Sequence, residues 1–123
     1  MARHLMYRTL TVLNGQTVGV LEDHAAAQMF AQAIGVTIFT PDTLPEATPT
    51  ISVAHKESPV AGDYARLQTQ AGTDFPVLVA DRATPLPFAP FAALKITLGG
   101  AAGADRAFQV LCQIDSSFGG VIP

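Results

Sequence analysis

Leu94–Ile114 reads LKITL, then GGAAGADR, then AFQVLCQI, so that two apolar runs flank a glycine-rich link. Large apolar side chains stand at every second position of each run: Leu94, Ile96 and Leu98 in the first, and Phe108, Val110, Cys112 and Ile114 in the second. A period of two is typical of a strand with one buried face. We therefore predict an antiparallel β-hairpin whose two strands are joined by the glycines.

A second interpretation of the same stretch is a strand, a phosphate-binding glycine loop and a helix, as in a nucleotide enzyme. A dinucleotide-binding unit needs a helix after its glycines and a further strand with an acidic residue about twenty positions on. Only twenty residues follow Gly103, and no Gly-Lys-Ser/Thr sequence is present. The period of two in Ala107–Ile114 also disagrees with a helix. These observations argue against nucleotide binding.

The rest of the chain supplies further strand candidates about ten residues apart, separated by Gly, Pro, Asn and Asp. Asn14-Gly15 is a strong hairpin signal, and it lies between the first two candidates. About eight short strands predict an all-β fold, an antiparallel β-sandwich or jelly roll. Besides the two strands of Leu94–Ile114, the candidates are Arg8–Leu13, Gln16–Leu21, Val36–Thr40, Thr50–His55, Tyr64–Gln70 and Phe75–Ala80.

One short helix is predicted near residues 25–34. Asp23 is a suitable N-cap, and Gly35 would end the helix. Its apolar face would contain Met29, Phe30, Ala33 and Ile34. Proline-rich segments at 41–49 and 84–90 are predicted to hold no regular element.

The composition of the 123 residues indicates a single domain with a thinly charged surface. The apolar fraction is 49%, although 20 of these residues are alanine, and only 14% are charged. Soluble domains average about 25% charged residues, so we expect a partner to cover part of the surface. The net charge of −3 gives no support for a nucleic-acid partner. No apolar run reaches the roughly 18 residues of a membrane span, and no secretory leader is apparent, so we expect synthesis in a cytoplasm.

Titratable residues form no pattern that predicts catalysis. His4, His24 and His55 lack metal-ligand neighbours at the usual spacing, and Cys112 is expected to be a buried, inert thiol. No serine lies in a nucleophile elbow. We therefore expect no enzyme activity and no cofactor.

Loop carboxylates are expected to cap turns, with a calcium site as the alternative. These residues are Asp42, Glu46, Asp63, Asp74 and Asp81. Asp105-Arg106 is expected to close the turn before the last strand, with Arg106 paired to a carboxylate of a neighbouring loop.

Several short segments together resemble a family of small proteins encoded in the structural gene regions of tailed bacteriophages. The similarity extends from about residue 9 to 114. The segments are Asn14–Thr17, Gly35–Pro41, Thr50–Val53, Gly62-Asp63-Tyr64, Leu94-Lys95-Ile96 and Ala104-Asp105-Arg106-Ala107-Phe108. The chain departs from the family at Ala25–Ile34, which is longer than the usual link. The resemblance implies a place in the virion and supplies no catalytic residue.

These observations predict a virion structural protein, most specifically a decoration or cement protein on the capsid exterior. We expect an N-terminal arm at 1–8, a β-sandwich domain at 9–115 and a C-terminal tail at 116–123. The two ends would bind the major capsid protein or other virion proteins and would hold a homo-oligomer, a trimer in the simplest case. The candidate partner-binding residues are Arg3, Tyr7, Arg8, Phe118, Val121 and Ile122.

The alternative function is a module at the neck, tail or fibre that binds host glycans. It would use aromatic loop residues, namely Tyr64, Phe88 and Phe91.

Overall fold

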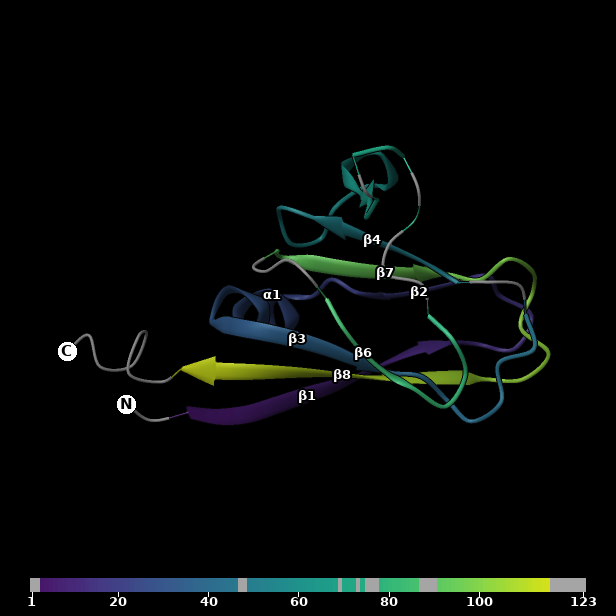
Figure 1. The fold of residues 1–123 in the computed structure, drawn as a ribbon. Coiled ribbons are helices and arrows are strands. Elements are labelled where there is room, and N and C mark those ends of the chain that lie inside the picture. The colour runs from purple at the N-terminus through teal and green to yellow at the C-terminus, as the bar shows by residue number, and fades with distance from the viewer. Residues whose placement is uncertain are drawn as a thin grey trace.

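The computed structural model describes residues 3–46, 49–68, 70–72, 74, 78–86 and 91–115 (Figure 1), with side chains from residue 5 to residue 114. Eight strands form two antiparallel four-stranded sheets, and the all-β sandwich is confirmed. The first sheet has the order β1 (Arg3–Val12), β8 (Arg106–Asp115), β3 (Ala33–Phe39) and β6 (Ala83–Pro85). The second has the order β2 (Val18–Leu21), β7 (Ala93–Thr97), β4 (Thr50–Ala54) and β5 (Ala65–Arg66).

The core lies between the two sheets, where the alternating positions of the central strands meet. The inward residues of β8 are fully buried, and so are Leu94 and Ile96 of β7 on the opposite side. Leu10, Ile38 and Ile51 extend this core across neighbouring strands. The predicted inward faces are therefore correct for both runs of the Leu94–Ile114 stretch.

The predicted hairpin between these two runs is wrong. β7 belongs to the second sheet and β8 to the first, and neither pairs with the other. The link of residues 98–105 carries the chain across the core from one sheet to the other. A period of two shows which face of a strand is apolar, but it does not show which strand is its neighbour.

The hairpin predicted at Asn14-Gly15 is wrong for the same reason, although the turn itself is present. β1 and β2 lie in different sheets, and Gly15 adopts a positive φ of 86° in the connection between them. This connection lies beside the β7–β8 link. The backbone N–H of Gly15 donates to the carbonyl of Ala102 (2.8 Å), and that of Ala102 donates to Gln16 (2.9 Å). The connection from β3 to β4 also leads from the first sheet to the second, at the same end of the sandwich as these two connections (Figure 1).

Asp23 caps the predicted helix, which is shorter than expected. α1 (His24–Ala31) begins where the Asp23 carboxylate accepts a hydrogen bond from the N–H of Ala26 (2.8 Å). β3 follows at Ala33, so Ile34 and Gly35 belong to a strand, with a shift of register between Ala33 and Gly35. The helix therefore ends before Gly35, because the chain from Ala33 onward pairs with β8 as a strand. α1 has eight residues, and no helix among the described residues could span a membrane.

Three predicted segments differ in the second half of the chain. The strand expected at Tyr64–Gln70 is reduced to β5, next to a one-turn 3-10 helix, η1 (Ala61–Asp63). Residues 78–80 are not in a strand, and 75–77 lie outside the described residues. β6 includes Pro85, where no regular element was expected. Proline is tolerated here because β6 is an edge strand of the first sheet.

The N-terminal arm predicted at residues 1–8 is also not separate from the domain. Residues 3–8 are the first six positions of β1 and pair with β8 in continuous register, from Arg3 opposite Asp115 to Arg8 opposite Val110. Long β8 supplies unpaired backbone groups along this whole length, so β1 extends to match it. Residues 1 and 2 and the predicted tail at 116–123 lie outside the described residues.

Gly19 of β2 allows the two sheets to approach each other closely. A Cβ built at this position would lie 2.7 Å from Cδ2 of Leu10 and 2.7 Å from the carbonyl oxygen of Thr11, both on β1. We expect Gly19→Ala to lower the free energy of unfolding by about 1–3 kcal/mol, the usual cost of overpacking a core. Urea unfolding measures it. Gly100→Ala is the control, since a Cβ there meets no atom within 4 Å, and an equal loss in both variants would contradict the expectation.

Candidate interaction surface

The side of the first sheet that points away from the core, called the outer face below, is an open surface. Strand register aligns its residues in five rows, each of which crosses two to four of the strands β1, β8, β3 and β6. Residues opposite each other on paired strands point to the same side of a sheet. One row, Arg3–Asp115, is charged. The other four rows are Leu5–Gln113–Gly35, Tyr7–Leu111–Thr37–Pro85, Thr9–Gln109–Phe39–Ala83 and Thr11–Ala107.

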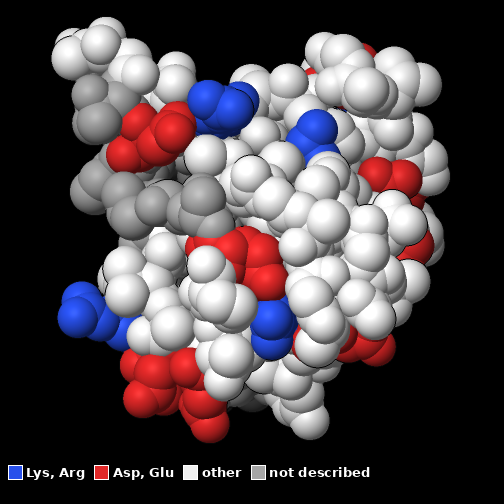
Figure 2. Space-filling view, turned by 90° about the vertical axis from the view of Figure 1, so that its right-hand side faces the viewer, with Lys and Arg blue, Asp and Glu red and all other residues white. Residues whose placement is uncertain are grey.

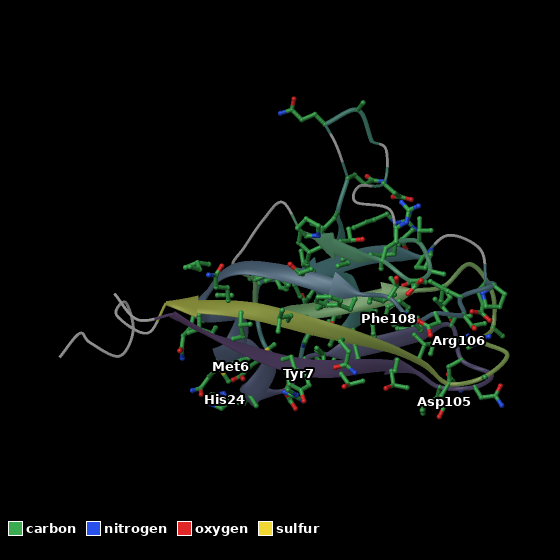
Figure 3. The ribbon with its side chains drawn as sticks, turned by 60° about the horizontal axis from the view of Figure 1, so that its bottom comes forward. Met6, Tyr7, His24, Asp105, Arg106 and Phe108 are labelled. Atoms are coloured by element: carbon green, nitrogen blue, oxygen red, sulfur yellow. The ribbon has the colours of Figure 1, made fainter. Side chains whose placement is uncertain are left out.

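No residue in these four rows is charged, and three large apolar side chains are well exposed. Leu5 is 63% exposed, Tyr7 67% and Phe39 41%. Figure 3 shows this side of the sheet, with Tyr7 on the central part of β1. By contrast, the side of the second sheet that points away from the core carries two charged residues, Lys95 and Arg66, in one cross-strand row. The outer face is therefore the part of the described surface most suited to contact with another protein.

The structure places the candidate partner-binding residues in different surroundings. Tyr7 lies on the outer face, whereas Arg8 points to the other side of β1, where its guanidinium binds Asp23. Arg3 lies in β1, but its side chain is outside the described part, as are Phe118, Val121 and Ile122 altogether. The sequence-based list missed Leu5 and Phe39. A usable signal was present in β8, because Ala107, Gln109, Leu111 and Gln113 leave its second face uncharged up to Asp115.

Arg8 and Asp23 connect β1 to the start of α1. Both guanidinium Nη atoms donate to the Asp23 carboxylate, at 3.1 and 3.0 Å. These hydrogen bonds and the one from the Ala26 N–H hold the pKa of Asp23 at about 2. A carboxylate whose pKa is lowered by folding stabilises the fold at pH values above its unfolded-state pKa. This contribution is lost as the pH falls through the folded-state pKa.

We expect Asp23→Asn to reduce the acid sensitivity of the protein. Asparagine also caps helices well, so the variant loses mainly the ion pair and the titrating group. At pH 7 it should melt a few degrees below the unaltered protein, about 1–4 °C for an exposed pair. This difference should disappear as the pH falls from about 4 to 2. Thermal melts across this range measure it, and a constant difference at every pH would contradict the expectation.

A second charged group ties together the three connections at one end of the sandwich. Arg106, at the start of β8, donates from Nε and Nη2 to the two carboxylate oxygens of Glu46, at 3.0 and 3.1 Å. Glu46 lies in the β3–β4 connection and also accepts from the N–H of Gly103 (3.2 Å). Asp105 accepts from the N–H of Asn14 (2.8 Å) in the β1–β2 connection. Figure 2 looks onto this end, where acidic and basic side chains gather among uncharged ones.

The expected pairing of Arg106 with a loop carboxylate is thus confirmed, and its partner is Glu46. The two side chains are 11% and 7% exposed. The hydrogen bonds from Arg106 lower the pKa of Glu46. Because both carboxylate oxygens are occupied, the arrangement serves to hold the fold together.

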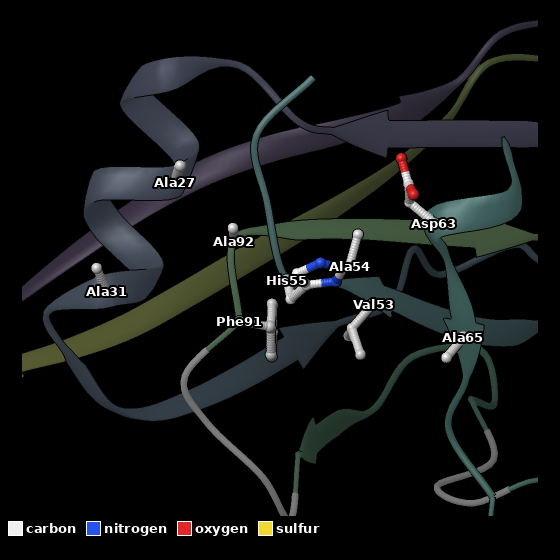
Figure 4. A pocket seen from close by; sticks show the side chains of 9 residues that line it. All are labelled: Ala27, Ala31, Val53, Ala54, His55, Asp63, Ala65, Phe91 and Ala92. Carbon is white, nitrogen blue, oxygen red and sulfur yellow. The ribbon is translucent and has the colours of Figure 1, made fainter. Parts of the chain in front are cut away.

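A wide apolar depression of about 520 Å³ lies between α1, β4 and the segment around Phe91 (Figure 4). Five of its nine lining residues are alanines. Its polar groups are His55 and Asp63, but the Asp63 carboxylate already accepts the N–H of Val60 (2.9 Å) and binds Lys56 (3.2 Å). The depression therefore offers apolar contact and little specific recognition.

The aromatic residues proposed for glycan binding have structural roles where they are described. Tyr64 donates its hydroxyl to Glu22 (2.9 Å), and the Lys95 ammonium lies 4.5 Å from the centre of its ring. Burial and the bond to Glu22 raise the pKa of Tyr64. Phe91 packs against Phe30, with ring centroids 4.7 Å apart. Phe88 lies outside the described residues.

Among the described residues, no three His, Cys, Asp or Glu side chains come together in a way that would hold a metal ion. His24 Nδ1 lies 2.8 Å from Glu57 Oε2, and Asp74 binds Gln68 and Arg66. Cys112 is buried in the core, as predicted, and burial raises the pKa of its thiol to about 12. A thiol with this pKa is a poor nucleophile at neutral pH.

Comparison with known proteins adds no relative: no family model matches the chain, and no curated protein or solved structure is significantly similar to it.

Proposed function

We propose that the protein is a non-catalytic structural component of a tailed-bacteriophage virion, acting as a decoration protein on the capsid exterior. The observation that carries an assembly role is the outer face of the first sheet. Four rows of uncharged side chains, with Leu5, Tyr7 and Phe39 well exposed, form a surface of the kind that proteins use to bind other proteins.

The charged groups of the domain support the same proposal. The carboxylates of Asp23, Glu46 and Asp63 are occupied by hydrogen bonds and ion pairs that hold segments of the chain together. Such groups strengthen the scaffold and are not free to act on a substrate. The virion setting comes from the resemblance of Leu94-Lys95-Ile96 and the Ala104–Phe108 segment to phage structural proteins.

The direct test is to purify the particles and count the copies of the protein in each by quantitative mass spectrometry. Decoration of an icosahedral capsid predicts on the order of hundreds of copies, because the protein repeats with the lattice. About six to twelve copies would place it at the neck or tail instead. Its absence from particles that contain all other structural proteins would overturn the proposal.

The contribution of the chain ends to particle binding can be tested by truncation. Removal of residues 1–8 would delete six of the ten positions of β1 and disrupt the sheet. A chain ending at Asp115 keeps every described strand, so it is the appropriate truncation. We expect it to remain folded and to lose occupancy on particles, while full occupancy would exclude the tail as the attachment segment.

A further inference from the structure

Large and small side chains are divided across the outer face. The β1 side carries Leu5 and Tyr7, which are bulky and exposed. In the same two rows, the β3 and β6 side carries Gly35, Thr37 and Pro85. In these two rows the β1 side is therefore raised and the β3 and β6 side is low. The third row reverses this order, with Thr9 on β1 and the bulky Phe39 on β3.

We propose that the outer face binds a second copy of this chain, with a two-fold axis parallel to the strands. This axis brings the outer faces of the two copies together. The β1 side of one copy then lies over the β3 and β6 side of the other, and each row keeps its position along the strands. Tyr7 of one copy then lies over Thr37 and Pro85 of the other, and Leu5 lies over Gly35. In each of these rows the bulky side chain of one copy faces the small side chains of the other, as the close packing of two sheets requires.

The size of the face suits a weak dimer. The 13 residues of the four uncharged rows, spaced about 4.8 Å across the strands and about 6.6 Å along them, outline roughly 400 Å². This is about half of the roughly 800 Å² per partner of a standard interface, so we expect the dimer to dissociate on dilution.

The four uncharged rows favour a second copy over a charged partner. Rows without charged groups complement other such rows, since neither side then buries an unpaired ion. The one charged row of the face pairs Arg3 with Asp115 in register at its end. The same patch on both subunits is also what a closed two-fold dimer needs. This inference rests on the proposed assembly role, in which the dimer would be the unit that attaches to the particle.

Sedimentation velocity of the purified protein from about 1 µM to 1 mM tests the proposal. We expect a dimer for the unaltered chain. Tyr7→Lys should weaken the dimer at least about a hundredfold, because the symmetry repeats the substitution and each copy costs about tenfold or more. Val20→Lys is the matched control, since Val20 is 39% exposed on the outward side of the second sheet, and it should leave the dimer intact.

A second variant tests the direction of the axis. Tyr7 and Thr37 are separated by β8 within one copy, but the axis brings them together between copies. Tyr7→Lys combined with Thr37→Glu should therefore recover at least about tenfold of the lost affinity through opposite charges. Thermal melts confirm that each variant is folded.

A chain that remains monomeric, a trimer, or an equal loss in Val20→Lys would overturn the proposal, and a double variant without recovery would overturn the axis. The virion proposal fails separately. A monomer found on particles contradicts only the dimer, and a dimer missing from particles contradicts only the virion assignment.

Discussion

Phe108→Ala should lower the free energy of unfolding by about 3–5 kcal/mol, the usual range for a phenylalanine removed from a core. Phe108 is fully buried at an inner strand of the first sheet, where it faces the second sheet. The truncated side chain would leave a cavity that rigid neighbouring strands cannot close. Small domains have total stabilities of about 5–15 kcal/mol, so a large part of the stability would be lost. Urea unfolding followed by circular dichroism measures the change.

Phe39→Ala is the matched control for this substitution. Phe39 lies on the outer face and is 41% exposed, so its removal from the monomer should cost less than about 1 kcal/mol. The measurement belongs at low protein concentration, where self-association does not contribute. Similar losses in the two variants would contradict the placement of Phe108 in the core.

Arg106→Met should lower the melting temperature by about 10 °C or more, because it leaves the Glu46 carboxylate without its charged partner in a nearly enclosed position. The double variant with Glu46→Gln should melt above Arg106→Met, since a neutral amide needs no counter-charge. Glutamine also keeps a carbonyl oxygen for the N–H of Gly103.

Arg66→Met provides the comparison for an exposed ion pair. Arg66 Nη1 lies 3.7 Å from Asp74 Oδ1, and the two side chains are 53% and 34% exposed. Such pairs contribute little, so the melting temperature should change by less than about 3 °C. If Arg66→Met lowered the melting temperature as much as Arg106→Met, burial of the Arg106–Glu46 pair would not explain the effect of Arg106→Met.

The sequence predicts the strands and their faces well, because burial on one side of a strand imposes a period of two on its residues. Phe108–Ile114 shows this directly, and the N-cap at Asp23 follows from the chemistry of a short carboxylate at a helix start. The partners of the strands could not be predicted in this way. β7 and β8 have the same pattern whether they form a hairpin or face each other across a core, and only packing of the whole chain decides between the two.

The candidate surface was only partly predictable for the same reason. Tyr7 could be selected as an exposed aromatic near the chain start, but Leu5 and Phe39 join it only through the register of β1, β8 and β3. Arg106 was expected to find a loop carboxylate. That this carboxylate is Glu46 depends on three connections meeting at one end of the sandwich, which is a property of the tertiary structure.

The positions of β7 and β8 also determine when the chain can fold. They come last along the chain among the described strands, yet each is an inner strand of its sheet. β7 lies between β2 and β4, and β8 lies between β1 and β3. Before they emerge, only β3 with β6 and β4 with β5 have a partner. Pairing strands that are distant in sequence is slow, and β1 and β2 must wait with their apolar residues uncovered. A nascent chain therefore has no complete native sheet until β7 and β8 have been made, and the interval before that is when it most needs protection from aggregation.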